Sequence, residues 1–174
     1  MSNPILSAAE HESLYAARLR LMSLPAERII DVQTAPAALQ LHRLNGEPAE
    51  VREAALAFLK AVNELCDGVL RKQSRGVNRS SVQAAEEGFA VLGRFGLGTD
   101  EPAAFLRSLR DARAAERHLD VAGIDAAITA RAAARAERDF ATADRLQQEL
   151  LARGVVLNDH ATGSEWTLTT SAPR

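Results

Sequence analysis

Aromatic residues and cysteine are scarce in this sequence. Only 4% of its 174 residues are aromatic although 47% are hydrophobic, so alanine and leucine must supply most of the packing. This composition favours helices that pack closely on one another. The single cysteine, Cys66, excludes an internal disulfide framework and a zinc site built from several thiols. We therefore expect a reducing compartment and a cytoplasmic location.

Long apolar runs and an excess of positive charge are also missing. No stretch approaches the roughly 18 apolar residues of a membrane-spanning helix, and the N-terminus has no basic segment followed by an apolar core. The 21 Lys and Arg residues are outnumbered by 23 Asp and Glu, which gives a net charge of -2. The sequence therefore predicts a soluble protein with no membrane partner, and any contact with RNA must come from local patches.

No catalytic or metal-binding pattern stands out. The histidines, His11, His42, His118 and His160, are scattered, and none has metal-ligand spacing with Cys66. Cys66 lies on an apolar helical face, which favours a buried, inert thiol over a nucleophile. The segment "GRFGLG" follows a predicted helix rather than a strand, unlike a phosphate-binding loop. We expect no catalytic residues, no metal and no cofactor.

Apolar spacing predicts a helical bundle over residues 1–115. Ser7 can cap the first helix, and Pro48 opens a long third helix with one broad apolar face. Ser80 or Ser81 is expected to cap the fourth helix, after a turn at 76–78. The predicted helices span residues 7–24, 34–44, 48–72, 80–95 and 103–113, and the charged stretch 116–120 is a candidate linker.

Residues 121–174 form a second predicted domain. A helix is expected over 124–138, Asp139 is expected to cap the next helix, and Gly154 is expected to end that helix in a left-handed turn. The period then changes, which predicts strands at 155–158 and 165–169, joined by "DHATGS". The predicted fold class is mainly α: an antiparallel helical bundle followed by a small helical hairpin with a C-terminal two-stranded β-hairpin.

The first helix of this hairpin carries a row of arginines. On an ideal helix Arg131, Arg135 and Arg138 continue an apolar stripe that begins at Ile124 and Ile128. Three neighbouring cations repel one another, so an anionic partner is expected. In one reading, acids of the hairpin neutralise the row internally, the candidates being Glu137, Asp139 and Asp144. In the other, the row is left free to read unpaired bases together with nearby carboxylates, which accept amino protons.

The second helix of the hairpin is expected to bury one arc of its surface. Asp144 falls about 40° from Phe140 on an ideal helix, and hence at the margin of this arc. From there it can hold an arginine or accept hydrogen bonds from a base edge. The predicted buried residues are Phe140, Ala143, Leu146 and Leu150.

Several segments resemble one known family. The stretch "ARAAARAERDFATADRLQQELLARGVVLND", followed by a loop and Trp166, resembles the C-terminal anticodon-binding domain of cysteinyl-tRNA synthetases. Upstream, "VLGRFGLGTDEPAAFL", "DVQTAPAAL" and "FLKAVNEL" are similar to the helical region before that domain. The resemblance implies that the bundle contacts the elbow of a tRNA and that the terminal unit recognises the anticodon. It implies no catalysis by this chain, because the family's nucleotide-binding signatures are absent from the sequence.

The same resemblance assigns candidate site residues. Carried over position by position, it implies that Arg135, Asp144 and Asp159 contact the anticodon and that Trp166 supports them or stacks beside them. A packed hairpin residue is the alternative for Trp166. The basic turn 71–79 is either a contact for tRNA phosphates or a solvated loop. The predicted tRNA-binding residues are Arg131, Arg135, Arg138, Asp144, Asp159 and Trp166.

Departures from the family pattern leave three functional readings open. After Trp166 this chain has "TLTTSAPR" where the family usually continues with basic residues, and Pro36 stands one position later than the family's proline. The first reading is a noncatalytic tRNA-binding protein, with cysteine tRNA as its partner, which reads the anticodon or assists a separate synthetase-like catalytic protein. The second is a protein-interaction module on the inherited scaffold. The third is the recognition fragment of a longer cysteine-tRNA ligase.

Overall fold

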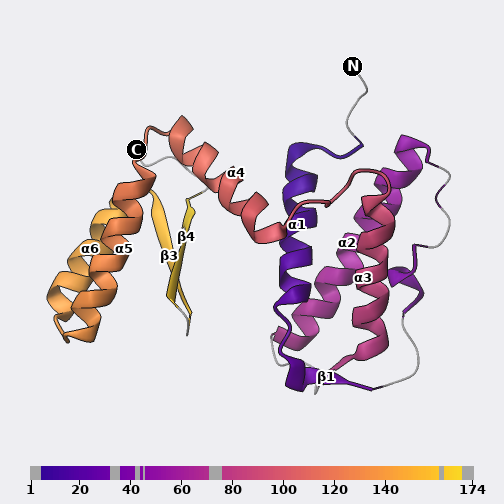
Figure 1. Cartoon of the computed structure of the whole chain (residues 1–174), viewed down its shortest axis with the longest axis horizontal. Coiled ribbons are helices and arrows are strands. Elements are labelled where there is room, and N and C mark those ends of the chain that lie inside the picture. Colours follow the sequence, from indigo (N-terminus) through magenta and orange to yellow (C-terminus); the bar gives the residue numbers. More distant parts are fainter. Residues whose placement is uncertain are drawn as a thin grey trace. The chain divides into compact units, whose positions relative to one another are not determined.

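The computed structural model describes residues 5–31, 36–41, 44, 46–70, 76–160 and 163–169. The protein is mainly helical and ends in a two-stranded antiparallel sheet, which confirms the predicted fold class (Figure 1). The chain divides into two compact units, Met1–Leu106 (unit 1) and Arg107–Arg174 (unit 2). The division falls inside the helix α4 (Pro102–Glu116). Within the described ranges, no helix combines the length and apolar character that crossing a membrane requires.

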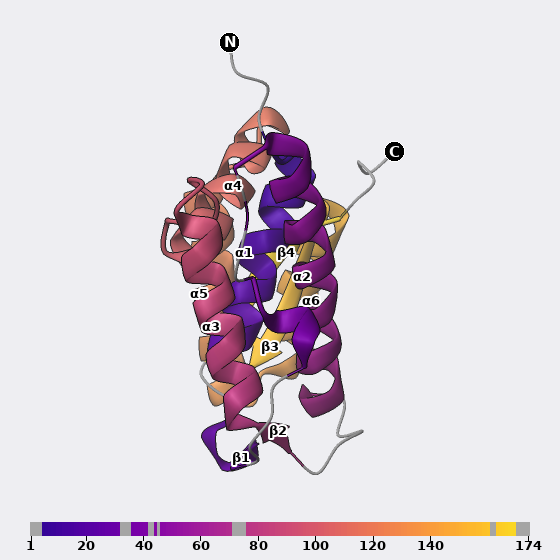
Figure 2. The same cartoon turned by 90° about the vertical axis from the view of Figure 1, so that its right-hand side faces the viewer.

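Unit 1 is built on three long helices, α1 (Ala8–Met22), α2 (Pro48–Leu70) and α3 (Arg79–Gly93), which lie side by side (Figure 2). Their apolar faces enclose one core, where Phe58 is fully buried and meets Phe89 edge to face with ring centroids 5.0 Å apart. A Cβ at Gly88 would come within 2.4 Å of the Phe58 ring, so this glycine allows α3 to approach α2 closely. The buried residues of α2 on the predicted apolar face are Val51, Ala55, Phe58, Leu59, Val62, Cys66 and Val69. Leu70, which the spacing also placed on this face, is 46% exposed, so that part of the prediction is wrong.

Side-chain caps explain where α1 and α3 begin. Ser7 caps α1 as predicted, because its hydroxyl accepts the Glu10 N–H while Glu10 Oε2 accepts the Ser7 N–H at 2.8 Å. For α3 the predicted caps Ser80 and Ser81 are wrong. Asn78 is the cap instead, since its Oδ1 accepts the Ser80 N–H at 3.1 Å.

A short parallel strand pair replaces the turn expected at 76–78. The strand β1 (Ile29–Ile30) pairs with β2 (Val77–Asn78). Gly76 makes this possible, since a Cβ there would lie 2.6 Å from the carbonyl oxygen of Arg28. The rest of the predicted basic turn, residues 71–75, lies outside the described residues.

The helix expected over 34–44 is wrong in the part that the structure describes. Residues 36–41 hold a single 3-10 turn, η2 (Ala37–Leu39), similar in length to η1 (Ala26–Arg28); the predicted first residue, Thr34, lies outside the described residues. Pro36 enters the turn with an extended ψ of 137°. Leu39 is buried and η2 packs on α2 and α3, so one anchored leucine holds this segment without a longer helix.

Unit 2 consists of the end of α4, the helices α5 (Val121–Ala136) and α6 (Phe140–Ala152), and the antiparallel strands β3 (Val155–His160) and β4 (Gly163–Leu168). The strands extend beyond their predicted ends, because His160 pairs with Gly163 and most of the expected "DHATGS" connection is strand. The buried core of this unit contains Ala114, Ile124, Leu150, Val155 and Trp166.

The turn between α5 and α6 departs from the prediction at one residue. Arg138 has a left-handed backbone with φ of 63°, so α5 ends at Ala136 rather than at Arg138. Asp139 then caps α6 as predicted, its carboxylate accepting the Thr142 N–H at 3.1 Å. Gly154 follows α6 with φ of 78°, the predicted left-handed turn. Arg138 is therefore not part of the helical arginine row.

Candidate functional site

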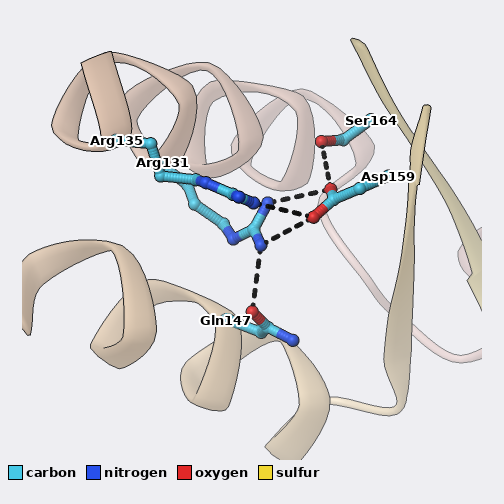
Figure 3. Close-up of polar contacts among 5 residues, drawn as sticks. All are labelled: Arg131, Arg135, Gln147, Asp159 and Ser164. Carbon is cyan, nitrogen blue, oxygen red and sulfur yellow. Dashed lines mark hydrogen bonds and ion pairs between the residues drawn. The ribbon is translucent and has the colours of Figure 1, made fainter. Parts of the chain in front are cut away.

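The carboxylate of Asp159 lies at the centre of a group of polar side chains in unit 2 (Figure 3). Arg131 of α5 binds it with both terminal nitrogens: Nη1 donates to Oδ1 and Nη2 donates to Oδ2, each at 3.0 Å. Arg135, one turn further along α5, donates from Nη1 to Oδ2 at 2.9 Å. The bidentate contact with Arg131 fixes the orientation of the carboxylate as well as its charge.

Two further side chains complete this group. Ser164 is the register partner of Asp159 on β4 and donates its hydroxyl to Oδ1 at 2.6 Å. Gln147 of α6 accepts a hydrogen bond from Arg131 Nη2 at 3.0 Å. We call these five residues, Arg131, Arg135, Gln147, Asp159 and Ser164, the Asp159 cluster. It joins both helices of the hairpin to both strands.

The members of the cluster differ in burial. Arg131 is 5% exposed, whereas the side chains of Asp159 and Arg135 are 43% and 51% exposed. Hydrogen bonds from Arg131 and then from Ser164 hold the pKa of the Asp159 carboxyl well below its usual range. The carboxylate is therefore ionised at neutral pH. The cluster therefore presents the Asp159 carboxylate and the half-exposed guanidinium of Arg135 to solvent, while the guanidinium of Arg131 is buried.

The lowered pKa of Asp159 predicts a pH dependence of stability. An Asp whose folded pKa lies below its unfolded value of about 3.9 stabilises the fold above that value, and the contribution is lost as pH falls through the folded pKa. We expect the difference in unfolding free energy between wild type and Asp159→Asn to be constant from about pH 7 to pH 5 and to shrink below about pH 4. Urea denaturation at a series of pH values measures it. A difference that stays constant down to about pH 2 would contradict the assignment.

The helix α6 exposes an aromatic ring. Phe140 is 59% exposed, so its predicted place in the buried arc is wrong. The observed arc is centred on Ala143 and Leu150, which lie about 60° and 80° around the helix from Phe140. Asp144 is exposed on the same face as Phe140, one turn further on, and its side chain makes no hydrogen bond or ion pair with another described residue.

Comparison with known proteins identifies the region that contains the cluster. The family model described as the "Cysteinyl-tRNA ligase anticodon binding domain" matches residues 121–166, a span that includes the whole Asp159 cluster. A cysteine–tRNA ligase of Anaeromyxobacter dehalogenans is 36% identical over 173 residues, which is 95% of this chain. The chain resembles the C-terminal region of the cysteine–tRNA ligase family.

Further members of the family match shorter parts of the chain. The cysteine–tRNA ligase of Acidovorax ebreus is 47% identical over 91 residues, 52% of this chain and 18% of the ligase. That of Nitratidesulfovibrio vulgaris is 35% identical over 112 residues, 63% of this chain and 22% of the ligase. The Anaeromyxobacter dehalogenans alignment covers 35% of that ligase. The chain therefore spans about a third or less of the length of the cysteine–tRNA ligases that it matches.

Within the matched segment 121–166, the structure brings together three of the predicted site residues. Asp159 neutralises Arg131 and Arg135, so the internal partner of the row is none of the acids proposed from sequence. The expectation of a freely exposed row is wrong for Arg131, which is buried. Arg138 is exposed and makes no side-chain ion pair with another described residue. Of the row, Arg135 alone is both held by Asp159 and open to solvent.

Trp166 packs inside unit 2. It is 3% exposed, and its indole Nε1 donates to Asp125 Oδ1 at 2.9 Å. The guanidinium of Arg110 lies 3.9 Å from the ring centroid and covers the ring. Of the two alternatives predicted from the sequence, the structure agrees with the packed hairpin residue. Trp166 supports β4 and does not present its ring to solvent.

Sequence reasoning missed Gln147 and Ser164. Ser164 could have been found from the register of the strand pair, but the predicted strands ended too early to place it opposite Asp159. Gln147 carries no signal of its own, because a glutamine on a helix is ordinarily solvated. Its contact with Arg131 follows only from the packing of α6 on α5.

Proposed function

We propose that this chain binds tRNA without catalysing a reaction, and that unit 2 contacts the anticodon loop, with cysteine tRNA as the first candidate. The observation that carries the proposal is the Asp159 cluster itself: a half-exposed ion pair of Arg135 and Asp159, held by the buried Arg131, inside the segment that matches the family's anticodon-binding domain. Catalytic residues for amino-acid activation would lie outside these 174 residues, on a separate polypeptide or on the same one.

The chemistry of the exposed groups suits unpaired bases. A carboxylate accepts hydrogen bonds from base amino groups, and a guanidinium donates to base acceptors or to phosphate. The exposed ring of Phe140 adds a flat apolar surface on which a base can stack. Arg138 and Asp144 are exposed on the same hairpin and can extend the contact. An overall charge of -2 makes these local groups, rather than bulk attraction, the source of affinity.

Titration with tRNA tests this proposal directly. Wild-type protein is titrated with cysteine tRNA and with the same tRNA carrying a substituted anticodon, at about 0.1 M salt, where surface attraction is partly screened. We expect the substituted tRNA to bind more weakly. Equal affinity for both would remove anticodon reading, and absence of binding to either would remove the tRNA-binding function.

Replacing Arg135 is expected to weaken tRNA binding without unfolding unit 2. Arg135→Ala removes a half-exposed cation that makes one hydrogen bond, and we expect an approximately tenfold loss of affinity, equivalent to about 1.4 kcal/mol. Arg145→Ala is the matched control. It removes the same charge from α6, where Arg145 pairs with Glu149 at 2.7 Å, and it lies about 160° around the helix from Gln147. Equal losses in both variants would point to net charge rather than to the cluster.

Replacing Phe140 is expected to weaken tRNA binding through lost stacking. A base stacked on an aromatic ring contributes about 1 to 3 kcal/mol, so Phe140→Ala should reduce affinity by about fivefold or more. Leu151→Ala is the control, because Leu151 is similarly exposed (55%) and lies about 20° around α6 from Phe140, but it cannot stack. Unchanged binding by Phe140→Ala would leave the ring without a role in RNA recognition.

The exposed apolar face of α6 also supports a second candidate, a protein partner. Phe140 and Leu151 lie on one side of the helix, as do the anchors of helices that bind in protein grooves. A pull-down after nuclease treatment separates the two functions. A stoichiometric protein that is lost with either Phe140→Ala or Leu151→Ala would favour the protein partner, whereas RNA binding should be weakened by Phe140→Ala and not by Leu151→Ala.

A further inference from the structure

The acceptor positions of the Asp159 carboxylate are all occupied from within the chain. Oδ1 accepts from Arg131 Nη1 and from the Ser164 hydroxyl, and Oδ2 accepts from Arg131 Nη2 and Arg135 Nη1. A carboxylate has about four lone-pair positions in its plane. A base amino group therefore finds no vacant acceptor on Asp159 in this arrangement, and one of the internal donors must leave before Asp159 can accept from RNA.

Arg131 is the donor that is hardest to displace. It is 5% exposed and makes both bonds of a bidentate pair, and Gln147 accepts a third bond from it. Its Nε is already buried without a hydrogen-bond partner among the described residues. Withdrawing the carboxylate would leave a buried cation uncompensated, which is strongly unfavourable.

Ser164 is held by the backbone. It is the register partner of Asp159 in the β3–β4 ladder, and its hydroxyl lies 2.6 Å from Oδ1. Arg135 differs from both, because it makes a single hydrogen bond to the carboxylate and its side chain is 51% exposed. Exposed ion pairs contribute little to stability, since water replaces the lost bonds. Arg135 is therefore the exchangeable partner of Asp159.

We propose that the Arg135–Asp159 ion pair is a gate that an RNA base opens: an exocyclic amino group of an unpaired base replaces Arg135 Nη1 on Asp159 Oδ2, and Arg135 moves to an acceptor of the RNA. This rests on the proposed tRNA-binding function and names the group that is recognised. The exchange conserves the number of hydrogen bonds, because the amine supplies the N–H that Arg135 withdraws, and a phosphate or base acceptor receives the released guanidinium. Arg131, Gln147 and Ser164 act as positioning residues that keep Asp159 in place while the exchange occurs.

Removing single amino groups from the RNA tests the gate. The probe is the anticodon stem-loop of cysteine tRNA, in which one loop base at a time loses its amine: inosine for guanosine, purine riboside for adenosine and pyrimidin-2-one riboside for cytidine. We expect one of these changes to weaken wild-type binding by about tenfold, the cost of one lost base contact, while the others have little effect. If the unmodified stem-loop binds and no amine matters, Arg135 stays on Asp159 and the gate is overturned.

The variant Arg135→Met separates the gate from a static site. It keeps an unbranched apolar stem and removes the guanidinium donor, so one acceptor position of the Asp159 carboxylate is open before RNA arrives. We expect weaker overall binding, because the released cation is missing, but the same penalty of about tenfold or more for the sensitive amine. A penalty that disappears in Arg135→Met would overturn the gate, because the amine would then depend on Arg135 rather than replace it.

NMR of the arginine side chains distinguishes the gate from a purely structural role of the Arg135–Asp159 ion pair, because a structural ion pair would stay unchanged when RNA binds. On saturation with the stem-loop, the guanidinium signals of Arg135 should shift to a new environment while those of Arg131 keep their free-state positions. Unchanged Arg135 signals in the complex would overturn the proposal. Failure of the unmodified stem-loop to bind wild type would instead remove the proposed RNA-binding function, and the gate with it, so the two failures are distinguishable.

Discussion

Replacing Asp159 with alanine is expected to lower the free energy of unfolding of unit 2 by about 3 kcal/mol, the lower end of the range for breaking a buried ion pair. The substitution leaves the buried guanidinium of Arg131 with Gln147 as its remaining side-chain partner. The expected loss is at the lower end because Asp159 itself is 43% exposed and its charge is partly solvated before the change.

Trp166 provides the measurement for this prediction. It is the single tryptophan of the chain and is buried in unit 2, so its fluorescence during urea denaturation reports the unfolding of this unit. Asp144→Ala is the matched control, because it removes an exposed aspartate that makes no ion pair with another described residue, and it should change stability by less than about 0.5 kcal/mol. Similar losses in the two variants would show that the cluster does not stabilise unit 2.

Replacing Phe58 with alanine is expected to cost about 3 to 4 kcal/mol in unit 1. The ring is fully buried, packs edge to face on Phe89 and lies against the Cα of Gly88, so its removal leaves a cavity that tightly packed helices close only in part. Thermal denaturation followed by the helical circular dichroism signal measures the change. In the matched control Phe140→Ala, the same atoms are removed from a ring that is 59% exposed, and we expect a loss below about 1 kcal/mol. Equal losses would mean that the assigned burial of the two rings is wrong.

Residues with strong local preferences were predictable. Ser7, Asp139 and Gly154 perform the capping and turn roles expected of them, because a side-chain oxygen at a helix start and a glycine at a left-handed position satisfy their own neighbours. The buried face of α2 could be predicted from apolar spacing over 23 residues, because in a helix of this length one misplaced residue does not change the direction of the apolar face. In contrast, the segment 34–44 offered one proline and a short apolar run, which did not distinguish a helix from an anchored turn.

The candidate site was predictable in its residue types and not in its partners. Arg131, Arg135 and Asp159 were selected from the charge pattern and the family resemblance, and all three meet in the structure. Which acid neutralises the row depends on how β3 packs beside α5, and helix periodicity contains no information about that packing. For the same reason Phe140 was wrongly predicted to be buried, and the sequence left two alternatives for Trp166. The sequence shows that an aromatic ring is hydrophobic, but it does not show how exposed the ring is.

The helical character of this protein and the change to strands after Gly154 follow from local sequence, because each depends on neighbours a few positions away. The charged residues of the terminal hairpin can be named from the sequence directly. The tertiary structure alone decided that Arg131 is buried, that Arg135 stays half-exposed and that all acceptor positions of Asp159 are occupied. The contacts of the two arginines and Gln147 join residues 16 to 28 positions apart, and Ser164 reaches Asp159 across the strand pair. Such contacts are set by packing and pairing between elements rather than by local preference.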